Sequence, residues 1–186
     1  REWLPVGETP WKEYPIADLG TYYRTDTRAV ARSKPYSSGD FMRAADPAKA
    51  LAEFRDGAWR DPAMTMLGTE QESWLFKALA RNKGTWAVVG SGTNMGYNYT
   101  PDQALDWFPG DTPDSRKNFV RNGIASAKAG LPYNLDNWGG YPAARSRLLD
   151  AAQRADANLV VVTGDSHNGW AYDLPEAGKP AGVEFG

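Results

Sequence analysis

The 186-residue sequence contains no cysteine and only one histidine, His167. The lack of cysteine excludes disulfides, thiolate metal ligands and a cysteine nucleophile, but it does not identify the compartment, because cytosolic and exported proteins can both lack cysteine. No apolar run approaches the roughly 20 residues that a membrane-spanning helix needs, and no stretch has the pattern of a signal peptide. The formal net charge of −2 gives no electrostatic basis for binding nucleic acid or an anionic membrane.

The remaining composition is that of a globular protein, with 41% hydrophobic and 24% charged residues. The length predicts one domain. The chain begins at Arg1 without a methionine and stops at "AGVEFG", which has the pattern of an unfinished β-strand. We therefore expect a piece of a longer protein, with a mature processed form as the alternative.

Helix and strand patterns alternate along the chain. Asp46 and Pro47 are a typical helix start, and Thr69 with Glu72 predicts a capping box at the start of a second helix. Strands are predicted at 21–30, 85–90, 158–163, and through "GWAYDL" and "AGVEFG", and a further helix at 142–156. Because "NLVVVT" contains a continuous apolar run, we expect both faces of the sheet to be covered there. The order predicts an α/β fold with a partly parallel sheet.

Residues 97–138 are rich in Asn, Asp, Pro and Gly, with one short amphipathic run near "SRKNFVRNGIASA". We expect a long loop with little regular structure, and loops of this length are usually functional or disordered. Its many aromatic residues favour an ordered segment that shapes access to a site.

The stretch "NLVVVTGDSHNGWAYDL" places polar side chains directly after an apolar strand. Open α/β sheets bind ligands at the carboxyl ends of their strands. Asp165 and His167 are two residues apart, so an extended segment would project both to one side, where they could ligate iron, manganese or zinc. The alternative is purely structural, with the histidine capping a strand and the aspartate forming an Asx-turn.

The same letters also resemble the first block of the GDS-type esterases, with Ser166 as nucleophile. That chemistry needs a general base within hydrogen-bond reach of the serine hydroxyl. The only histidine is adjacent, and adjacent side chains of an extended segment point to opposite sides. The esterase interpretation therefore requires a base from outside this sequence.

Several segments, in order, resemble the PhoD-like alkaline phosphatases, a branch of the metallophosphoesterases. They are "YRTDTRAVAR", "TMLGTEQESWLFKAL", "TWAVVGSG", "WGGYPAARSRLLDA" and "NLVVVTGDSHNGWAYDL" followed by "GVEFG". The resemblance covers most of 21–186, and its most specific parts are the Leu-Gly-x-Glu-Gln helix entry and the Thr-Gly-Asp-x-His-x-x-Trp strand. It implies the C-terminal portion of a layered metallophosphoesterase-type fold, with a mixed, partly parallel sheet, flanking helices and a long aromatic-rich loop.

The resemblance implies a phosphatase or phosphodiesterase that hydrolyses phosphate esters by metal-activated water, with iron and calcium as the usual metals. Many family members are exported to the periplasm or cell surface. Asp165 and His167 correspond to metal ligands, and Ser166 to a spacer between them. Arg28 and Asn168 are candidates for binding substrate, although Arg28 could equally pair with Asp26 or another carboxylate.

Other residues of the matching segments are expected to be structural. Trp138 and Trp170 are predicted to pack around the site, and Glu70 and Gln71 to belong to a helix start outside it. The family usually has an aspartate where this chain has Gly139, which weakens any role for a carboxylate there.

A larger departure is that three earlier metal-binding motifs of the family are absent: an Asp-Cys pair, a Gly-Asp segment and an Asp-Asp-His-Glu segment. We therefore expect residues 1–186 to form a single incomplete domain that binds metal weakly and is inactive alone. An exposed sheet edge is expected to allow self-association. A non-catalytic binding domain on the same scaffold is the main alternative.

Overall fold

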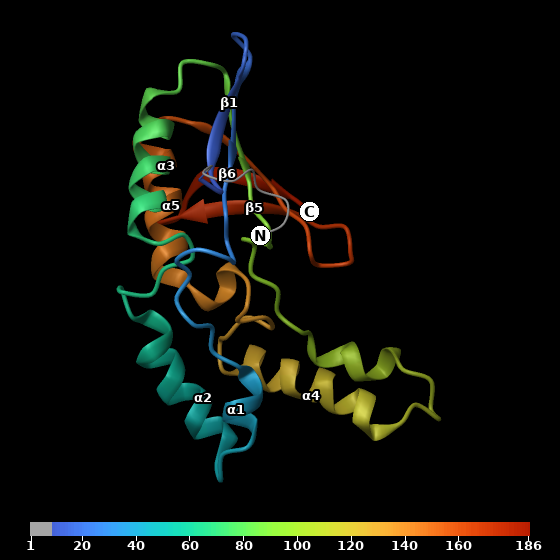
Figure 1. The fold of residues 1–186 in the computed structure, drawn as a ribbon. Helices are drawn as coiled ribbons and strands as arrows, with labels where there is room; N and C mark the ends of the chain where they lie inside the picture. Colours follow the sequence, from blue (N-terminus) through green and yellow to red (C-terminus); the bar gives the residue numbers. More distant parts are fainter. Residues whose placement is uncertain (1–8) are drawn as a thin grey trace. The chain divides into compact units, whose positions relative to one another are not determined.

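The structure, a computed structural model, describes residues 9–186 (Figure 1). The strands are β1 (Lys12–Ile16), β2 (Gly20–Arg24), β3 (Trp86–Gly90), β4 (Asn158–Val162), β5 (Ala171–Glu176) and β6 (Lys179–Phe185). The α-helices are α1 (Ser38–Met42), α2 (Pro47–Asp56), α3 (Thr69–Arg81), α4 (Asp114–Lys128) and α5 (Pro142–Arg154). Short 3-10 helices are η1 (Ala58–Arg60), η2 (Asp102–Trp107) and η3 (Trp138–Gly140). In the described part of the chain, no helix is both long and apolar enough to cross a membrane.

The chain forms two compact units. The first unit contains all six strands, α3, and α5 except for its first residue. The described residues of this unit are 9–34, 62–96 and 143–186. The second consists of residues 35–61 and 97–142 and contains the other helices.

The six strands form one sheet in the order β1-β2-β3-β4-β6-β5. Strands β2, β3, β4 and β6 run parallel, whereas β1 and β5 are antiparallel at the two edges. The predicted α/β fold with a mixed, partly parallel sheet and flanking helices is confirmed. Helix-containing segments connect β2 to β3 and β3 to β4, as parallel pairing requires.

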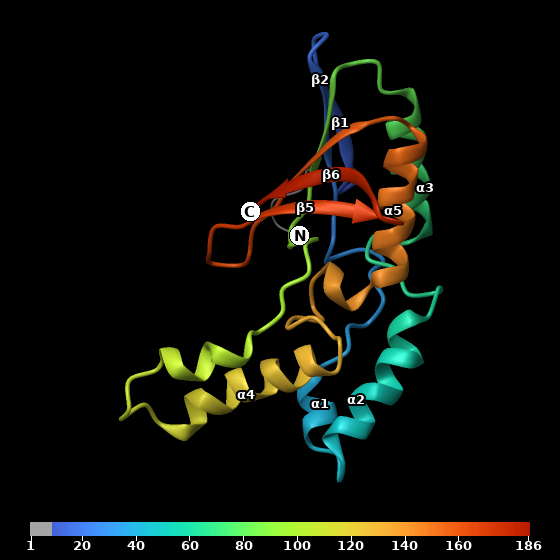
Figure 2. The same cartoon turned by 180° about the vertical axis from the view of Figure 1, so that it is seen from behind.

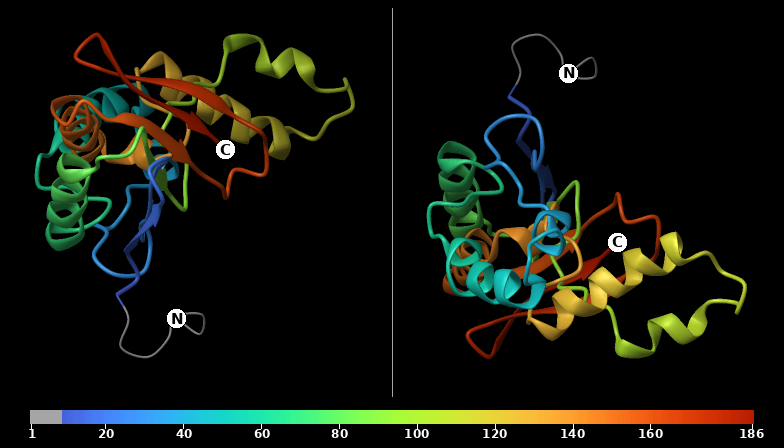
Figure 3. Two further views of the ribbon diagram at one scale, coloured as in Figure 1. Left: turned by 90° about the horizontal axis from the view of Figure 1, so that it is seen from above. Right: turned by 90° about the horizontal axis from the view of Figure 1, so that it is seen from below.

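Alternate cross-strand rows of the sheet differ in burial. Tyr23, Val89, Val161 and Glu184 form one row, and each is at most 1% exposed. Helices α3 and α5 lie on one side of the sheet (Figures 1 and 3), and the Tyr23 hydroxyl donates to the Ala78 carbonyl of α3 at 3.2 Å. These two helices therefore bury this face.

The opposite face carries apolar side chains that are only partly covered. The row Tyr22, Val88, Val160 and Val183 is half-buried, and the flanking Trp86, Val162 and Phe185 are 44%, 37% and 55% exposed. The expectation that both faces of β4 are covered is wrong for this chain. An apolar strand predicts that both faces are suited to burial, but only the helix side is buried among residues 9–186.

Helix α3 begins differently from its prediction. Thr69 is the first helical residue, Gly68 is the N-cap, and no side chain caps the helix, so the Thr69–Glu72 capping box is wrong. The Thr65 hydroxyl instead accepts a hydrogen bond from the Gly68 amide at 2.9 Å. The Glu72 carboxylate is paired with the Arg147 guanidinium of α5, which ties the two covering helices together.

The second unit has more regular structure than its sequence predicted. The expected short run within 97–138 is the 15-residue helix α4, so the expectation of a long irregular loop is wrong. Apolar residues widely separated in sequence form its core: Leu51, Phe54, Trp59, Leu131 and Leu135. Ala125 of α4 packs against this core and Ile124 is buried. Such packing, more than helix propensity, stabilises a helix whose sequence includes Gly123.

Gly139 occupies a tight position in the second unit. The Trp59 indole donates to the Gly139 carbonyl at 2.8 Å, and a Cβ at Gly139 would lie 2.8 Å from the Asn134 carbonyl oxygen. A side chain there would displace backbone atoms. Gly139 therefore fits the local packing.

Gln71 of α3 holds the loop that follows β2. Its side-chain oxygen accepts from the Asp26 amide at 2.8 Å, and its amide nitrogen donates to the Asp26 carbonyl at 2.9 Å. Gln71 is 1% exposed, so water cannot take the place of these hydrogen bonds if the side chain is changed. The sequence predicts a helix-start role for Gln71; in the structure its side chain is a clamp on the loop that carries Arg28.

We predict that Gln71→Met lowers the free energy of unfolding by about 2–3 kcal/mol, because the Asp26 backbone groups lose their buried partner. Urea denaturation followed by circular dichroism measures this change. Glu70→Gln is the control, because Glu70 is exposed, and should change stability by less than about 0.5 kcal/mol. Equal effects of the two substitutions would contradict the clamp.

Candidate functional site

Four parallel strands end at the same edge of the sheet and bring four segments together. The segment 25–29 follows β2, 91–96 follows β3, 163–170 follows β4, and Gly186 follows β6. Backbone hydrogen bonds continue the ladder here, from Ser91 N to the Val162 oxygen and from Thr163 N to the Phe185 oxygen, both at 2.9 Å. This is the edge at which open α/β sheets place their ligands.

Arg28 and Asp165 meet at this edge although 137 positions separate them in sequence. The Arg28 Nη2 lies 3.0 Å from Asp165 Oδ2, and both side chains are more than half exposed. Asp26, the other predicted partner, accepts hydrogen bonds through Oδ1 from the backbone amides of Arg28 and Ala29 at 2.9 Å each. Asp26 therefore shapes the loop that presents Arg28 to Asp165.

The segment carrying Asp165 and His167 is a turn. The φ angles are +65° at Asp165 and +58° at His167, in the left-handed region, so the expected extended geometry is wrong. The cause is the strand order: β6 lies between β4 and β5, so the chain leaving β4 must cross the end of β6. Both side chains are exposed. The loop between β4 and β5, which contains both residues, lies beside the C-terminus (Figure 2).

Asp165 and His167 alone do not form a metal centre. Within residues 9–186, no group of three or more His, Cys, Asp or Glu side chains is arranged to hold a metal ion. Stable cation binding depends on ligand number and geometry. Two donors on one exposed turn do not meet that requirement.

Ser166 and Asn168 bond within the same turn. The Ser166 hydroxyl donates to the Asn168 carbonyl at 2.9 Å, and the Asn168 side-chain amide donates to the Ser166 carbonyl at 3.1 Å. A nucleophilic serine instead donates its proton to a general base. This geometry gives both residues a role in closing the turn.

Support for the turn comes from residues that the sequence did not single out. Glu184 of β6 is fully buried and accepts hydrogen bonds from Thr163 Oγ1 at 2.8 Å, Asn94 Nδ2 at 3.1 Å and the Met95 amide at 3.0 Å. Burial raises the pKa of the nearby Tyr172 phenol, and the negative charge of Glu184 raises it further. A glutamate within an otherwise apolar strand was the only available signal.

The aromatic residues expected around the site differ in their placement. Trp170, at the end of the turn, stacks on Tyr172 with ring centroids 5.7 Å apart. The Tyr172 ring in turn leaves no room for a side chain at Gly96, where a Cβ would lie 2.3 Å from its Cγ. Trp138 is buried and belongs to the second unit.

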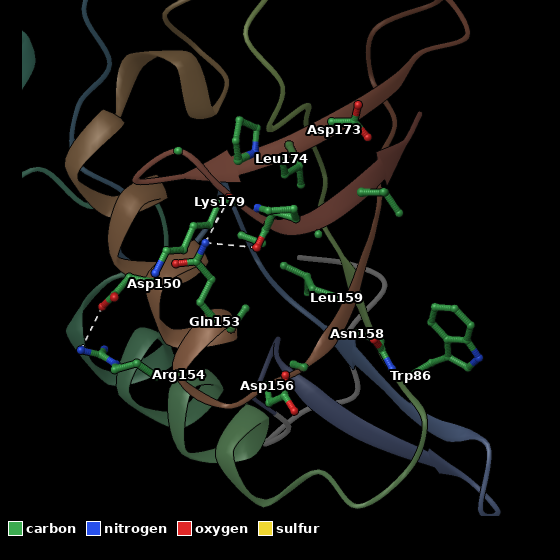
Figure 4. Close-up of a pocket in the computed structure, with 18 residues that line it drawn as sticks. Trp86, Asp150, Gln153, Arg154, Asp156, Asn158, Leu159, Asp173, Leu174 and Lys179 are labelled. Carbon is green, nitrogen blue, oxygen red and sulfur yellow. Dashed lines mark hydrogen bonds and ion pairs between the residues drawn. The ribbon is translucent and has the colours of Figure 1, made fainter.

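A depression of about 1000 Å³ lies at the other end of the strands (Figure 4). It is lined by Asn158 at the start of β4, Lys179 at the start of β6 and Arg154 at the end of α5. Gln153 donates there to the carbonyls of Glu176, Lys179 and Pro180 at 3.0–3.1 Å. The lining of the depression reaches Leu159 of β4 and Val183 of β6 but includes no residue of 163–170, so the depression and the Asp165 turn are distinct.

We predict that Arg28→Met changes the free energy of unfolding by less than about 1 kcal/mol, because exposed ion pairs contribute little. Arg147→Met is the comparison, since Arg147 pairs with a mostly buried Glu72 and donates to the Pro62 carbonyl; it should cost about 2 kcal/mol. Thermal and urea unfolding of both variants measure the difference. A large cost at Arg28 would make the Arg28–Asp165 pair a structural one.

Three comparisons with known proteins point to the same kind of phosphatase. The whole chain, residues 1–186, matches the family model described as PhoD-like phosphatase. The chain is 30% identical over 132 residues to alkaline phosphatase D of Bacillus subtilis (strain 168), which covers 68% of this chain and 18% of that protein. A solved structure described as "Structure of PhoD" is similar with a TM-score of 0.63 and 24% identity, over 98% of this chain and 29% of that one.

The observed fold therefore agrees with the family match. The chain spans less than a third of the length of either relative. The structural likeness supports the shared α/β fold. The family model covers every residue of the sequence, and on that basis the chain belongs to the PhoD-like phosphatase family.

Proposed function

We propose that this chain supplies one edge of the active site of a metal-dependent phosphatase or phosphodiesterase. The observation that carries the proposal is the meeting of Arg28 and Asp165, which come from segments after β2 and β4, at the ligand-binding edge of the sheet. Membership of a phosphatase family supports the reaction class. The substrate is a phosphate ester.

Each candidate residue has a chemical role in this proposal. Asp165 and His167 supply a carboxylate and an imidazole, which suit ions such as iron. Arg28 is suited to bind a phosphate oxygen, because guanidinium groups form strong charge-assisted hydrogen bonds with phosphate. Asn168 holds the turn and directly follows His167, and we propose that it contributes a polar contact to the substrate.

We propose that the remaining metal ligands come from outside this sequence, because no further His, Cys, Asp or Glu side chain joins Asp165 and His167 in a metal-binding group among residues 9–186. Iron with calcium, as the resemblance implies, remains our proposal for the metals. An exported location, in the periplasm or at the cell surface, is likewise proposed from the resemblance.

The half-buried face of the sheet has a place in the same proposal. The relatives extend well beyond the part that this chain matches. We propose that 1–186 is part of one phosphatase domain and that further residues of a longer protein pack on the apolar row containing Val88 and Val160. Self-association of the isolated chain through this face or through edge strand β1 is the expected consequence.

Two other functions, a serine esterase and a non-catalytic binding domain, can be distinguished from the phosphatase by experiment. A serine esterase is disfavoured by the Ser166 hydroxyl, which donates to a backbone carbonyl; labelling of Ser166 by a fluorophosphonate would revive it. A non-catalytic binding domain requires that the natural protein lack the family's other metal-binding motifs. The sequence encoded upstream of Arg1 separates it from the phosphatase.

We predict that the isolated chain binds Mn²⁺ or Fe²⁺ only weakly and hydrolyses p-nitrophenyl phosphate negligibly, because two ligands are too few. Isothermal titration and a colorimetric assay measure these properties. In a longer protein containing the missing motifs, Asp165→Asn should reduce turnover at least about 100-fold, with Asp173→Asn on β5 as an exposed control. Robust turnover by residues 1–186 alone would overturn this proposal.

We predict that Trp86→Ala costs about 1–2 kcal/mol in the isolated chain, because a side chain that is 44% exposed loses only part of its burial energy. In the longer protein the same substitution should cost about 3 kcal/mol or more, as for a buried aromatic residue. Leu159→Ala, on the helix-covered face, is the control and should be costly in both. Equal Trp86 effects in the two proteins would show that nothing further packs on this face.

A further inference from the structure

The carboxylate of Glu184 connects three segments at the ligand-binding edge. Its oxygens accept from Asn94 Nδ2 at 3.1 Å, from the Met95 amide at 3.0 and 3.1 Å, and from the Gly96 amide. They also accept from the Thr163 hydroxyl at 2.8 Å. The loop after β3 and the first residue after β4 are therefore both held by one side chain of β6.

The Asp165 turn is attached to β6 at both ends. At its start, Thr163 bonds through its amide to the Phe185 carbonyl and through its hydroxyl to Glu184. At its end, the Trp170 amide donates to the Gly186 carbonyl at 2.8 Å, and the Gly186 amide returns a bond at 2.9 Å. The residues between these anchors, including Asp165 and His167, are exposed or half-buried.

The local chemistry favours a carboxylate at position 184. All the groups directed at it are donors, and a buried carboxylate is stabilised when several donors satisfy its oxygens. The backbone amides of Met95 and Gly96, which could otherwise hold an external anion, are thus occupied by a group of the chain itself. A glutamine would place its own donors against the amide donors.

We infer that Glu184 is a positioning residue for the Asp165–His167 turn, acting through Thr163. Its carboxylate fixes the hydroxyl that begins the turn and the 94–96 loop beside it. The inference rests on the proposed function for its catalytic meaning, since the positioned residues are the proposed metal ligands. The placement of the turn itself can be measured without any metal.

The test is residue-resolved amide hydrogen exchange of the whole 186-residue chain. In Glu184→Gln, exchange of the Met95 and Gly96 amides and of Trp170 should accelerate about tenfold, because charge-assisted bonds are lost. Exchange of the β2 and β3 amides should stay within about twofold. Thr163→Val should accelerate Trp170 in the same way, whereas Thr163→Ser, which keeps the hydroxyl, should restore wild-type exchange.

Two outcomes would overturn the inference. One is unchanged exchange of Trp170 in both Glu184→Gln and Thr163→Val; the other is a uniform acceleration across the sheet, which marks a general stabilising role. If Glu184→Gln fails to fold, the Thr163→Val and Thr163→Ser pair decides alone.

A separate measurement tests the proposed function. His167 is the only histidine, so its ring protons give an unambiguous signal. Millimolar Mn²⁺ should broaden that signal in the wild-type chain and several-fold less in Thr163→Val. Absence of broadening in the wild type would count against the metal-ligand role of His167 and would leave the exchange result to decide the role of Glu184.

Discussion

The parallel register of β2, β3, β4 and β6 is the constraint on which the candidate site depends. Parallel strands place their carboxyl ends at one edge, so loops distant in sequence become neighbours. Arg28 and Asp165 meet only because β2 and β4 both flank β3 in the same direction. Gln71 then holds the first loop from the helix side, and Glu184 holds the others from within the sheet. The exposed side chains at this edge therefore lie on loops that buried hydrogen bonds of Gln71 and Glu184 hold in place.

The asymmetry of the sheet connects the fold with the proposed function. Helices α3 and α5 bury one face, while the other face exposes apolar side chains such as Trp86 and Phe185. Exposed apolar side chains that share one face of a sheet are typical of an interaction site. Within residues 9–186, Asp165 and His167 are also two metal-type donors with no third His, Cys, Asp or Glu grouped beside them. Both features are explained if the phosphatase domain extends beyond these residues, as we propose.

Much of the fold could be predicted from the periodicity of apolar residues and from the residues that typically begin or end helices. The apolar stripe after Thr69, the Pro142 helix start and the run "NLVVV" predicted α3, α5 and β4 correctly in type. The errors arose where long-range contacts decide. Helix α4 carries Ala125, which packs against a core that joins Leu51 to Leu131. The Asp165 turn is bent because β6, which comes later in sequence, inserts beside β4. Local patterns carry no information on such insertions.

By itself, the sequence determined the residue types available for chemistry: one histidine, no cysteine, and the Asp165–His167 pair after an apolar strand. It also determined the alternation of helix and strand, because hydrophobic periodicity is a local property of the chain. Only the tertiary structure decided which of these residues meet. The pairing of Arg28 with Asp165 and the burial of Glu184 under four donor groups depend on strand order and register. Those are set by contacts between segments tens to more than a hundred residues apart, which no short window of sequence contains.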